Sequence, residues 1–314
     1  MAIATRKQAK TDAGYVAHMR HLLNRKETLS SLLLAPAIVY IFALIGAPFF
    51  LALYYSLTDI TAGSPSLSFV GLQNFQSILS SSVFQRALWN TFVFAFFSQL
   101  LVLLLGKVLA LALNKTFPGK SVIRFLILLP WVAPIALGTI GWKWMYDSLY
   151  SVVNWSLQAI GLFGPGTWPM WLGEPGLAMI SVVLVHVWRT LPFAAVIILA
   201  GLTAIPQEIL DAASVDGANY WQRLFHVTIP LLLPILCVTV LFGTIFTFTD
   251  MSVIYILTRG GPYDTTQVLG SLAFFVGIIG GDLAEGAAIS LFLFPLLAVV
   301  AIFMLRLARR TEVN

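Results

Sequence analysis

PQEILDAASVDGANYWQRLFHVTIPLLLP, residues 206–234, is the longest amphipathic interruption in a very apolar chain. Pro206 suits the first turn of a helix, where a backbone N–H is not needed. Gly217 can adopt the left-handed conformation that ends such a helix. Asn219 can then cap a second short helix, residues 220–226. The stretch therefore predicts a compact helix–turn–helix segment between two apolar stretches, a shape that suits docking onto another protein.

The composition is that of a helical membrane protein. Hydrophobic residues make up 59% of the chain and charged residues only 10%, whereas an ordinary soluble domain has about 25% charged residues. Apolar stretches of about 20 residues recur, which is the length that a helix needs to cross a bilayer. The net charge of +5 gives no indication of nucleic-acid binding. The single cysteine, Cys237, excludes an intrachain disulfide and a cysteine metal site.

Six apolar stretches are predicted to be membrane-spanning helices within one transmembrane domain, residues 31–310. Their approximate ranges are 32–57, 86–113, 125–146, 177–202, 230–257 and 284–305. The first stretch has full spanning length, so we interpret it as a span and not as a cleavable signal. Prolines in the third stretch are expected to kink its helix, which neighbouring helices can accommodate in a membrane.

The distribution of Lys and Arg sets the predicted orientation. Fourteen of the eighteen lie in segments predicted to be cytoplasmic: six in residues 1–30, four in residues 107–124, Arg223, and three after the last span. By the positive-inside rule, both termini, including the tail 311–314, are expected in the cytoplasm. Residues 147–175 contain three Trp but no Lys or Arg, so we place them at the outer membrane interface.

Two sets of residues stand out inside the predicted spans, where ionisable side chains are costly and usually face the interior of the bundle. Within each set the spacing places the residues on one helical face. The fourth span contributes His186, Arg189, Thr190 and Phe193, and the fifth contributes Gly243, Thr247 and Asp250. The two faces are predicted to converge on a polar path with an aromatic wall. Such a path suits sugars, whose hydroxyls form hydrogen bonds and whose C–H faces stack on rings.

Other interpretations of the charged residues stay open. Arg189 and Asp250 could pair with each other, or with a partner subunit, only to stabilise packing. Arg189 could also extend its charge toward the membrane surface, or bind an anionic group of the substrate.

Motifs for catalysis are absent from the sequence. It has no G-x-x-x-x-G-K-[ST] phosphate loop and no nucleophile elbow, and His-x-x-x-His and Cys-x-x-Cys spacings are also missing. We therefore expect that this chain is not an enzyme, binds no metal or cofactor, and does not hydrolyse ATP.

Three groups in the amphipathic stretch carry a family resemblance: Asp211-Ala212-Ala213, Asp216-Gly217-Ala218 and Val227-Thr228-Ile229-Pro230. Together they resemble the EAA loop of ABC-importer permeases, the cytoplasmic coupling element that inserts into a cleft on the ATPase subunit. The acidic position is an aspartate, one methylene shorter than the usual Glu. The resemblance implies a coupling loop over residues 203–229, with its two helices within 206–226. It implies ATPase contacts at Glu208, Leu210, Asp211, Ala212, Ala213, Asp216 and Gly217.

Further segments resemble the carbohydrate branch of these permeases, namely residues 71–75, 90–91, 128–134, 142–144 and 258–262. A gap-free alignment on the coupling loop places the two intramembrane sets on sugar-lining positions of maltose-type permeases. Thr247, Asp250 and His186 fall where that system has amides, and Phe193 where it has an aromatic residue. Thr190 replaces a glycine and Arg189 an apolar residue, so we expect a substrate other than maltose.

The resemblance implies an all-α, six-span type I ABC importer permease, a multi-pass protein of a bacterial inner or plasma membrane. Its expected partners are a second related permease, two ATPase subunits that bind ATP and Mg²⁺, an extracytoplasmic solute-binding protein, a sugar and the lipid bilayer. One alternative is the same assembly importing glycerol phosphate or another anionic solute. Another is an ATP-independent secondary transporter or channel, which would leave residues 206–226 without a role. A membrane-embedded enzyme is disfavoured by the missing catalytic motifs.

Overall fold

The computed structural model describes residues 26–64, 67–164 and 166–312. Regular structure in these ranges is helical, and strand-type pairing is limited to one isolated bridge between Thr58 and Phe69. The chain divides into two units, Met1–Tyr54 and Tyr55–Asn314. Most of the predicted basic segment 1–30 lies outside the described residues.

The first unit contributes one long apolar helical stretch. It consists of α2 (Lys26–Ile41), the π-helical turn η1 (Phe42–Gly46) and α3 (Ala47–Tyr55). Leu29–Tyr55 is long and apolar enough to cross a membrane, and no residue in its most apolar part is buried. A helix that is apolar on all sides requires lipid or another protein around it, which agrees with the predicted first span.

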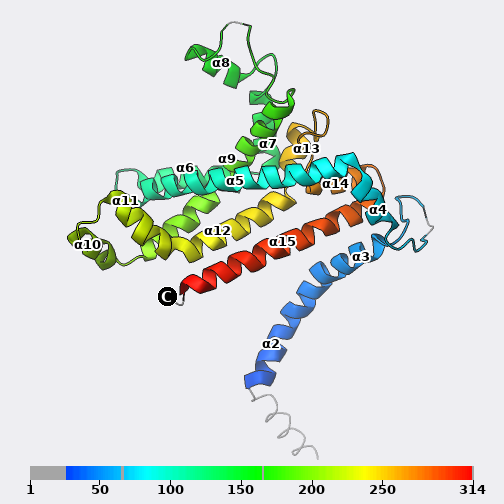
Figure 1. Cartoon of the computed structure of the whole chain (residues 1–314), viewed down its shortest axis with the longest axis horizontal. Helices are drawn as coiled ribbons and strands as arrows, with labels where there is room; N and C mark the ends of the chain where they lie inside the picture. Colours follow the sequence, from blue (N-terminus) through cyan, green and yellow to red (C-terminus); the bar gives the residue numbers. More distant parts are fainter. Residues whose placement is uncertain (1–25, 65–66, 165, 313–314) are drawn as a thin grey trace, which may run out of the picture. The chain divides into compact units, whose positions relative to one another are not determined.

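Four unbroken helical stretches of the second unit are also long and apolar enough to span a membrane. They are α5 (Ser82–Asn114), α9 (Pro175–Ala204), the stretch Tyr220–Thr249, and α15 (Leu283–Glu312). The third of these is built from α11 (Tyr220–Arg223), the π-helical turn η2 (Leu224–Thr228) and α12 (Ile229–Thr249). Helix α5 packs along α9, and α12 packs on both α9 and α15 (Figure 1). The predicted tail 311–314 therefore begins inside α15.

The predicted third span is sharply bent. Helices α6 (Lys120–Val132) and α7 (Ile135–Met145) meet at an angle of 92°. Ala133 between them is extended, because the ring of Pro134 disfavours helical backbone in the residue before it. The sequence predicted a kink, and the observed bend is close to a right angle. Six spans are counted only if this bent pair is one span.

The predicted fifth span has different ends in the structure. Its helix begins at Tyr220, before the predicted start at residue 230, and stops at Thr249, before the predicted end at residue 257. The π-helical turn η2 ends at Thr228, two residues before Pro230, and the helix continues past this residue, which donates no backbone hydrogen bond. The predicted second helix of the loop, residues 220–226, is therefore the first part of the spanning helix.

Short helices occupy segments that were predicted to be loops, or the end of the fifth span. They are α4 (Gln73–Ser80), α8 (Val152–Ala159), α13 (Ser252–Leu257) and α14 (Leu269–Phe274), which continues into the π-helical turn η3 (Phe275–Ile279).

The turn between α13 and α14 is fixed to α5 by two polar side chains. The Asn90 amide donates to the backbone oxygens of Asp264 and Gln267, at 3.1 and 3.0 Å. The Thr91 hydroxyl accepts the backbone N–H of Leu269 at 2.9 Å. These contacts give the Asn-Thr pair, noted above only as a family resemblance, a structural role.

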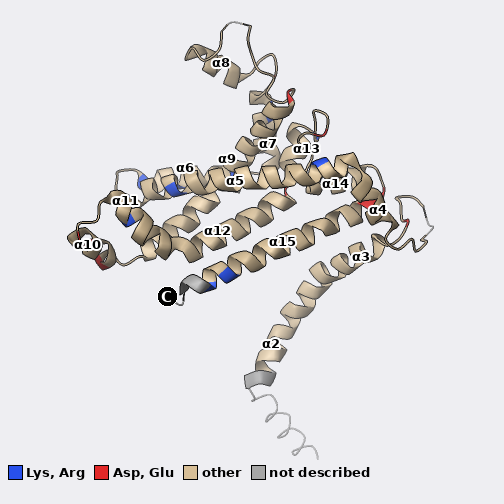
Figure 2. Cartoon of the chain, viewed as in Figure 1, with Lys and Arg blue, Asp and Glu red and all other residues tan. Residues whose placement is uncertain are grey.

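Charged residues are unevenly distributed in the second unit. Figure 2 shows Lys and Arg at the α5–α6 turn, on α11 and toward the C-terminal end of α15. The acidic residues of α10 (Gln207–Val215) lie near this same end. This gathering of cations is what the positive-inside rule expects of a cytoplasmic face; the orientation itself stays a prediction.

Candidate functional site

The amphipathic stretch folds as its turn residues predicted. Helix α10 follows Pro206, and Gly217 ends it with a positive φ of 79°. The backbone N–H of Ala218 donates to the oxygen of Ala213 at 3.0 Å and closes the helix end. Asn219 and Gln222 form a reciprocal capping box at the start of α11. The predicted helix start, stop and second cap are all confirmed.

The residues predicted to contact an ATPase lie on the surface of this segment. Glu208, Asp211, Ala212, Asp216 and Gly217 are exposed, and Leu210 and Ala213 are half-buried. The segment is linked to α11 by Arg223, which donates to the hydroxyl of Ser214 at 2.5 Å. The result is a small helix with an acidic exposed face, Val215 being 87% exposed at its end.

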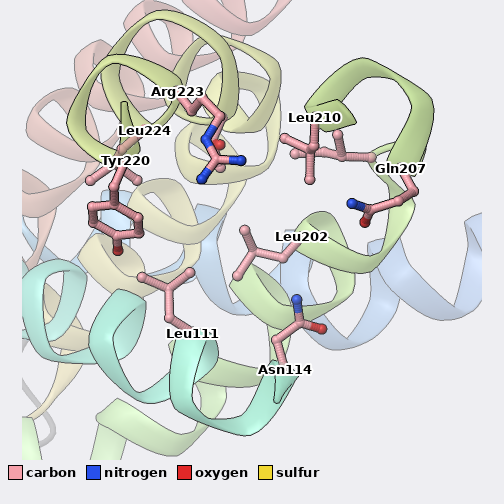
Figure 3. Close-up of a pocket in the computed structure, with 10 residues that line it drawn as sticks. Leu111, Asn114, Leu202, Gln207, Leu210, Tyr220, Arg223 and Leu224 are labelled. Carbon is pink, nitrogen blue, oxygen red and sulfur yellow. The ribbon is translucent and has the colours of Figure 1, made fainter. Parts of the chain in front are cut away.

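A cavity of about 220 Å³ lies beneath α10 (Figure 3). Its walls come from α10, α11, the turn η2 and the adjoining ends of α5 and α9. The lining residues are Leu111, Asn114, Leu202, Ile205, Gln207, Leu210, Tyr220, Arg223, Leu224 and Thr228. The cavity thus separates part of α10 from the ends of α5 and α9, and α10 is held mainly at its two ends.

The second predicted site lies where α12 ends and α13 begins. Asp250 follows the last residue of α12, and its Oδ1 accepts the backbone N–H groups of Ser252 and Val253 at 2.9 and 3.3 Å. Its Oδ2 accepts from Arg189 Nη1 at 2.9 Å and lies 2.9 Å from His186 Nδ1. One carboxylate therefore caps α13 and joins it to α9.

Thr247 extends this group of contacts to a third helix. Its hydroxyl lies 3.0 Å from His186 Nε2, donates to the oxygen of Gly243 at 2.8 Å, and accepts from Gln99 Nε2 of α5 at 3.0 Å. The Phe94 ring of α5 meets the edge of the His186 ring, with centroids 4.9 Å apart. On α9, the Thr190 hydroxyl donates to the backbone oxygen of His186 at 2.8 Å.

An aromatic cluster adjoins the polar group. Phe193, one helical turn beyond Arg189, stacks on Trp131 of α6 with centroids 4.7 Å apart and planes at 23°. Phe242 and Phe246 of α12 complete the cluster at 6.5 and 5.5 Å from Phe193. The aromatic wall predicted from Phe193 alone is therefore built from three helices.

Burial separates the predicted path residues into two groups. His186, Thr190, Gly243, Thr247 and Asp250 are buried, so in this conformation they hold the arrangement together and present little or no surface. The Arg189 side chain remains 24% exposed, and Phe193 is half-buried. The pairing of Arg189 with Asp250, one of the alternatives considered above, is present in the structure.

Gln99 was not predicted as a site residue from the sequence, and neither were Trp131, Phe242 and Phe246. Gln99 is a polar residue inside the predicted second span, so the rule applied to the fourth and fifth spans would have found it. The contacts among the aromatic rings could be identified only from the packing of α6, α9 and α12 in the structure. Among the residues that the structure describes, no group of three or more His, Cys, Asp or Glu is placed to hold a metal ion.

Comparisons with known proteins agree on one family. Residues 27–313 match the model of the family described as "binding-protein-dependent transport system inner membrane component". The chain is 36% identical over 277 residues to the trehalose/maltose transport system permease protein MalF of Thermococcus litoralis, covering 88% of this chain and 91% of that protein. It is 32% identical over 286 residues to the sulfoquinovosyl glycerol transport system permease protein SmoG of Agrobacterium fabrum, covering 90% and 91%.

A solved structure shares the fold. A chain of a bacterial ABC transporter involved in the import of the acidic polysaccharide alginate superposes with a TM-score of 0.77. The superposition covers 93% of this chain and 99% of the other, at 22% sequence identity. The fold is therefore that of an ABC importer permease, as predicted.

Proposed function

Because the chain belongs to the family of binding-protein-dependent transport system inner membrane components, we propose that it is the permease subunit of an ATP-driven ABC importer. In this role it forms half of the translocation path for a sugar. Two of its relatives are named as permeases for trehalose/maltose and for sulfoquinovosyl glycerol, which supports a carbohydrate or carbohydrate derivative as substrate. The protein is a multi-pass membrane protein.

One observation carries the sugar assignment: a fixed arginine lies one helical turn from a wall of aromatic rings. Asp250 holds one guanidinium nitrogen of Arg189 at 2.9 Å, while part of that side chain stays exposed and offers N–H donors to hydroxyls. Phe193 packs within the aromatic wall, and Phe242, which is 45% exposed, offers a ring face to the apolar side of a sugar. Donors and ring faces together match both sides of a pyranose.

We place the coupling to ATP hydrolysis at residues 206–226. The exposed acidic face of α10 and its attachment at both ends suit a helix that docks into a cleft of another subunit. The assembly would contain a second related permease, two ATPase subunits and an extracytoplasmic solute-binding protein. ATP and Mg²⁺ would bind to the ATPase subunits, since this chain lacks a phosphate-loop sequence.

An anionic solute is the second candidate, because Arg189 is a cation with an exposed portion inside a spanning helix. The carboxylate of Asp250 already balances that charge at 2.9 Å, so a neutral polyol fits better. A substrate anion would have to replace Asp250 as the partner of Arg189.

The test is ATPase activity of the affinity-purified assembly in lipid, with its binding protein, across a panel of sugars and organophosphates. Stimulation by a neutral sugar is the expected result. Stimulation only by anionic compounds would transfer the assignment to the second candidate. Failure of any ATPase to copurify would remove the coupling assignment and favour a secondary transporter.

A further inference from the structure

Gln99 on α5 is half-buried in the bundle and only partly satisfied in its hydrogen bonds. Its Nε2 donates to the Thr247 hydroxyl at 3.0 Å, whereas its Oε1 is buried and has no hydrogen-bond partner. A buried acceptor without a donor costs about 1–3 kcal/mol, and native proteins rarely leave one unpaired without a reason.

Gly243 on α12 has no conformational need to be glycine. It lies inside a helix and its φ is not positive, and alanine at an ordinary helix position would be favoured by about 1 kcal/mol. A Cβ at this position would overlap the Gln99 carboxamide oxygen and would come within 2.9 Å of its Nε2. The glycine therefore leaves the space that the Gln99 amide occupies.

A series of side-chain contacts connects Gln99 to the predicted sugar-path residues. Gln99 contacts Thr247, Thr247 contacts His186, and His186 contacts the Asp250 carboxylate that holds Arg189. The residue thus connects α5 with the α9–α12 site. Its unpaired acceptor Oε1 lies inside this buried arrangement, and Arg189, with its N–H donors, is the partly exposed end of the same arrangement. Sugar hydroxyls both donate and accept, so a sugar site requires both kinds of group.

We propose that Gln99 is a specificity-determining residue of the sugar path, whose unpaired Oε1 accepts one substrate hydroxyl when the path opens during transport, and that Gly243 is glycine to admit its amide. This inference rests on the proposed sugar-import function. It adds a third helix, α5, to the path and assigns a hydrogen-bond acceptor to it.

The experiment measures uptake into vesicles that contain the complete assembly and its binding protein. Trehalose, maltose and glucose are the probes, followed by monodeoxy analogues of whichever sugar is transported. Wild type is compared with Gln99→Leu and Gln99→Met, which keep the approximate volume and remove the acceptor. The amount of assembled complex and its maximal ATPase rate serve as controls for folding.

The expected result is a KM for uptake raised about 2- to 10-fold in both variants, the effect of one neutral hydrogen bond, with an unchanged maximal ATPase rate. Wild type should also discriminate against one particular deoxy analogue, and the variants should lose that discrimination. A purely structural role for Gln99 would not affect a single hydroxyl. Unchanged discrimination in either assembled variant overturns the proposal, whereas a wild-type assembly that imports no sugar overturns the proposed function instead.

Gly243→Ala tests independently whether Gly243 leaves room for the Gln99 amide. The added methyl should displace the Gln99 amide and lower the yield of assembled complex. The double variant Gly243→Ala with Gln99→Ala should restore that yield and retain the raised KM. Wild-type yield and wild-type KM in the single variant Gly243→Ala would contradict the assignment.

Discussion

Arg189 on α9 and Asp250 at the end of α12 form an ion pair of 2.9 Å, with the Asp250 side chain almost fully buried and the Arg189 side chain partly exposed. Taking an ion pair out of water is costly, and removing one partner of such a pair costs more than the pair contributes. The pair also fixes the point where α12 stops, because the same carboxylate caps α13. We infer that Asp250 acts on the substrate mainly by orienting Arg189.

Asp250→Asn tests this interpretation. Asparagine can still accept the backbone N–H groups of α13, so the assembly should form, but Arg189 loses its counter-charge. We expect sugar uptake to fall at least 10-fold while ATP hydrolysis stimulated by the binding protein persists, measured on the same vesicles. Asp264→Asn, at an exposed turn residue, is the matched control and should behave as wild type. If Asp250→Asn fails to assemble whereas Asp264→Asn assembles normally, the ion pair of Arg189 and Asp250 serves packing only.

Phe193→Ala should weaken sugar binding, because it removes one ring of the aromatic wall against which the sugar is proposed to lie. Phe193 stacks on Trp131 at 4.7 Å, and an aromatic pair contributes about 0.5–1.5 kcal/mol beyond its buried area. The expected outcome is a higher KM for uptake together with a modest loss of thermal stability. Phe193→Tyr, which keeps the ring, should retain a KM near that of wild type. An unchanged KM in the alanine variant would place the sugar away from this wall.

Gly217→Pro should uncouple transport from ATP hydrolysis. The positive φ of 79° at this residue is closed to proline, whose φ is fixed near −65°, so α10 would be redirected relative to α11. Asp211→Lys should uncouple as well by reversing the charge of the exposed face. Membrane insertion, checked by protease protection, should stay normal in both variants. Wild-type uptake in both α10 variants would contradict the docking role.

Asn90→Ala should loosen the turn between α13 and α14. The substitution removes two hydrogen bonds to backbone oxygens, at 3.1 and 3.0 Å. The Asp264 oxygen still accepts the backbone N–H of Gln267 at 3.3 Å, whereas the buried Gln267 oxygen loses the Asn90 donor, at a cost of about 1–3 kcal/mol. Faster proteolysis within residues 258–267 and a lower thermal unfolding temperature are expected. Gln85→Ala, on the exposed side of the same helix, should change neither quantity.

Local signals predicted the coupling segment well. Pro206, Gly217 and Asn219 act through their own backbone preferences, which neighbours in space hardly alter, so the start, stop and cap of its helices followed from the sequence. The composition and the length of the apolar stretches likewise predicted the long apolar helices, of which five, or six with the bent pair, are long enough to span a membrane.

Tertiary packing determined what the sequence could not predict. The prolines near residue 132 indicated a kink, but α6 packs on α9 while α7 packs on α13, and these contacts determine the 92° bend. The π-helical turn before Pro230 carries the helix past a residue expected to begin it. Burial of His186 and Thr247 depends on the approach of α5, which helical spacing in two other spans does not reveal.

Whether this protein serves an ATP-driven importer is tested by sugar uptake into vesicles that hold the assembly. The vesicles are prepared with or without ATP on the side of the ATPase subunits. Ionophores that dissipate ion gradients are added in parallel. Uptake is expected to require ATP and the binding protein, to persist with ionophores, and to disappear in Gly217→Pro. Uptake that proceeds without ATP and stops with ionophores would contradict it and identify a secondary transporter.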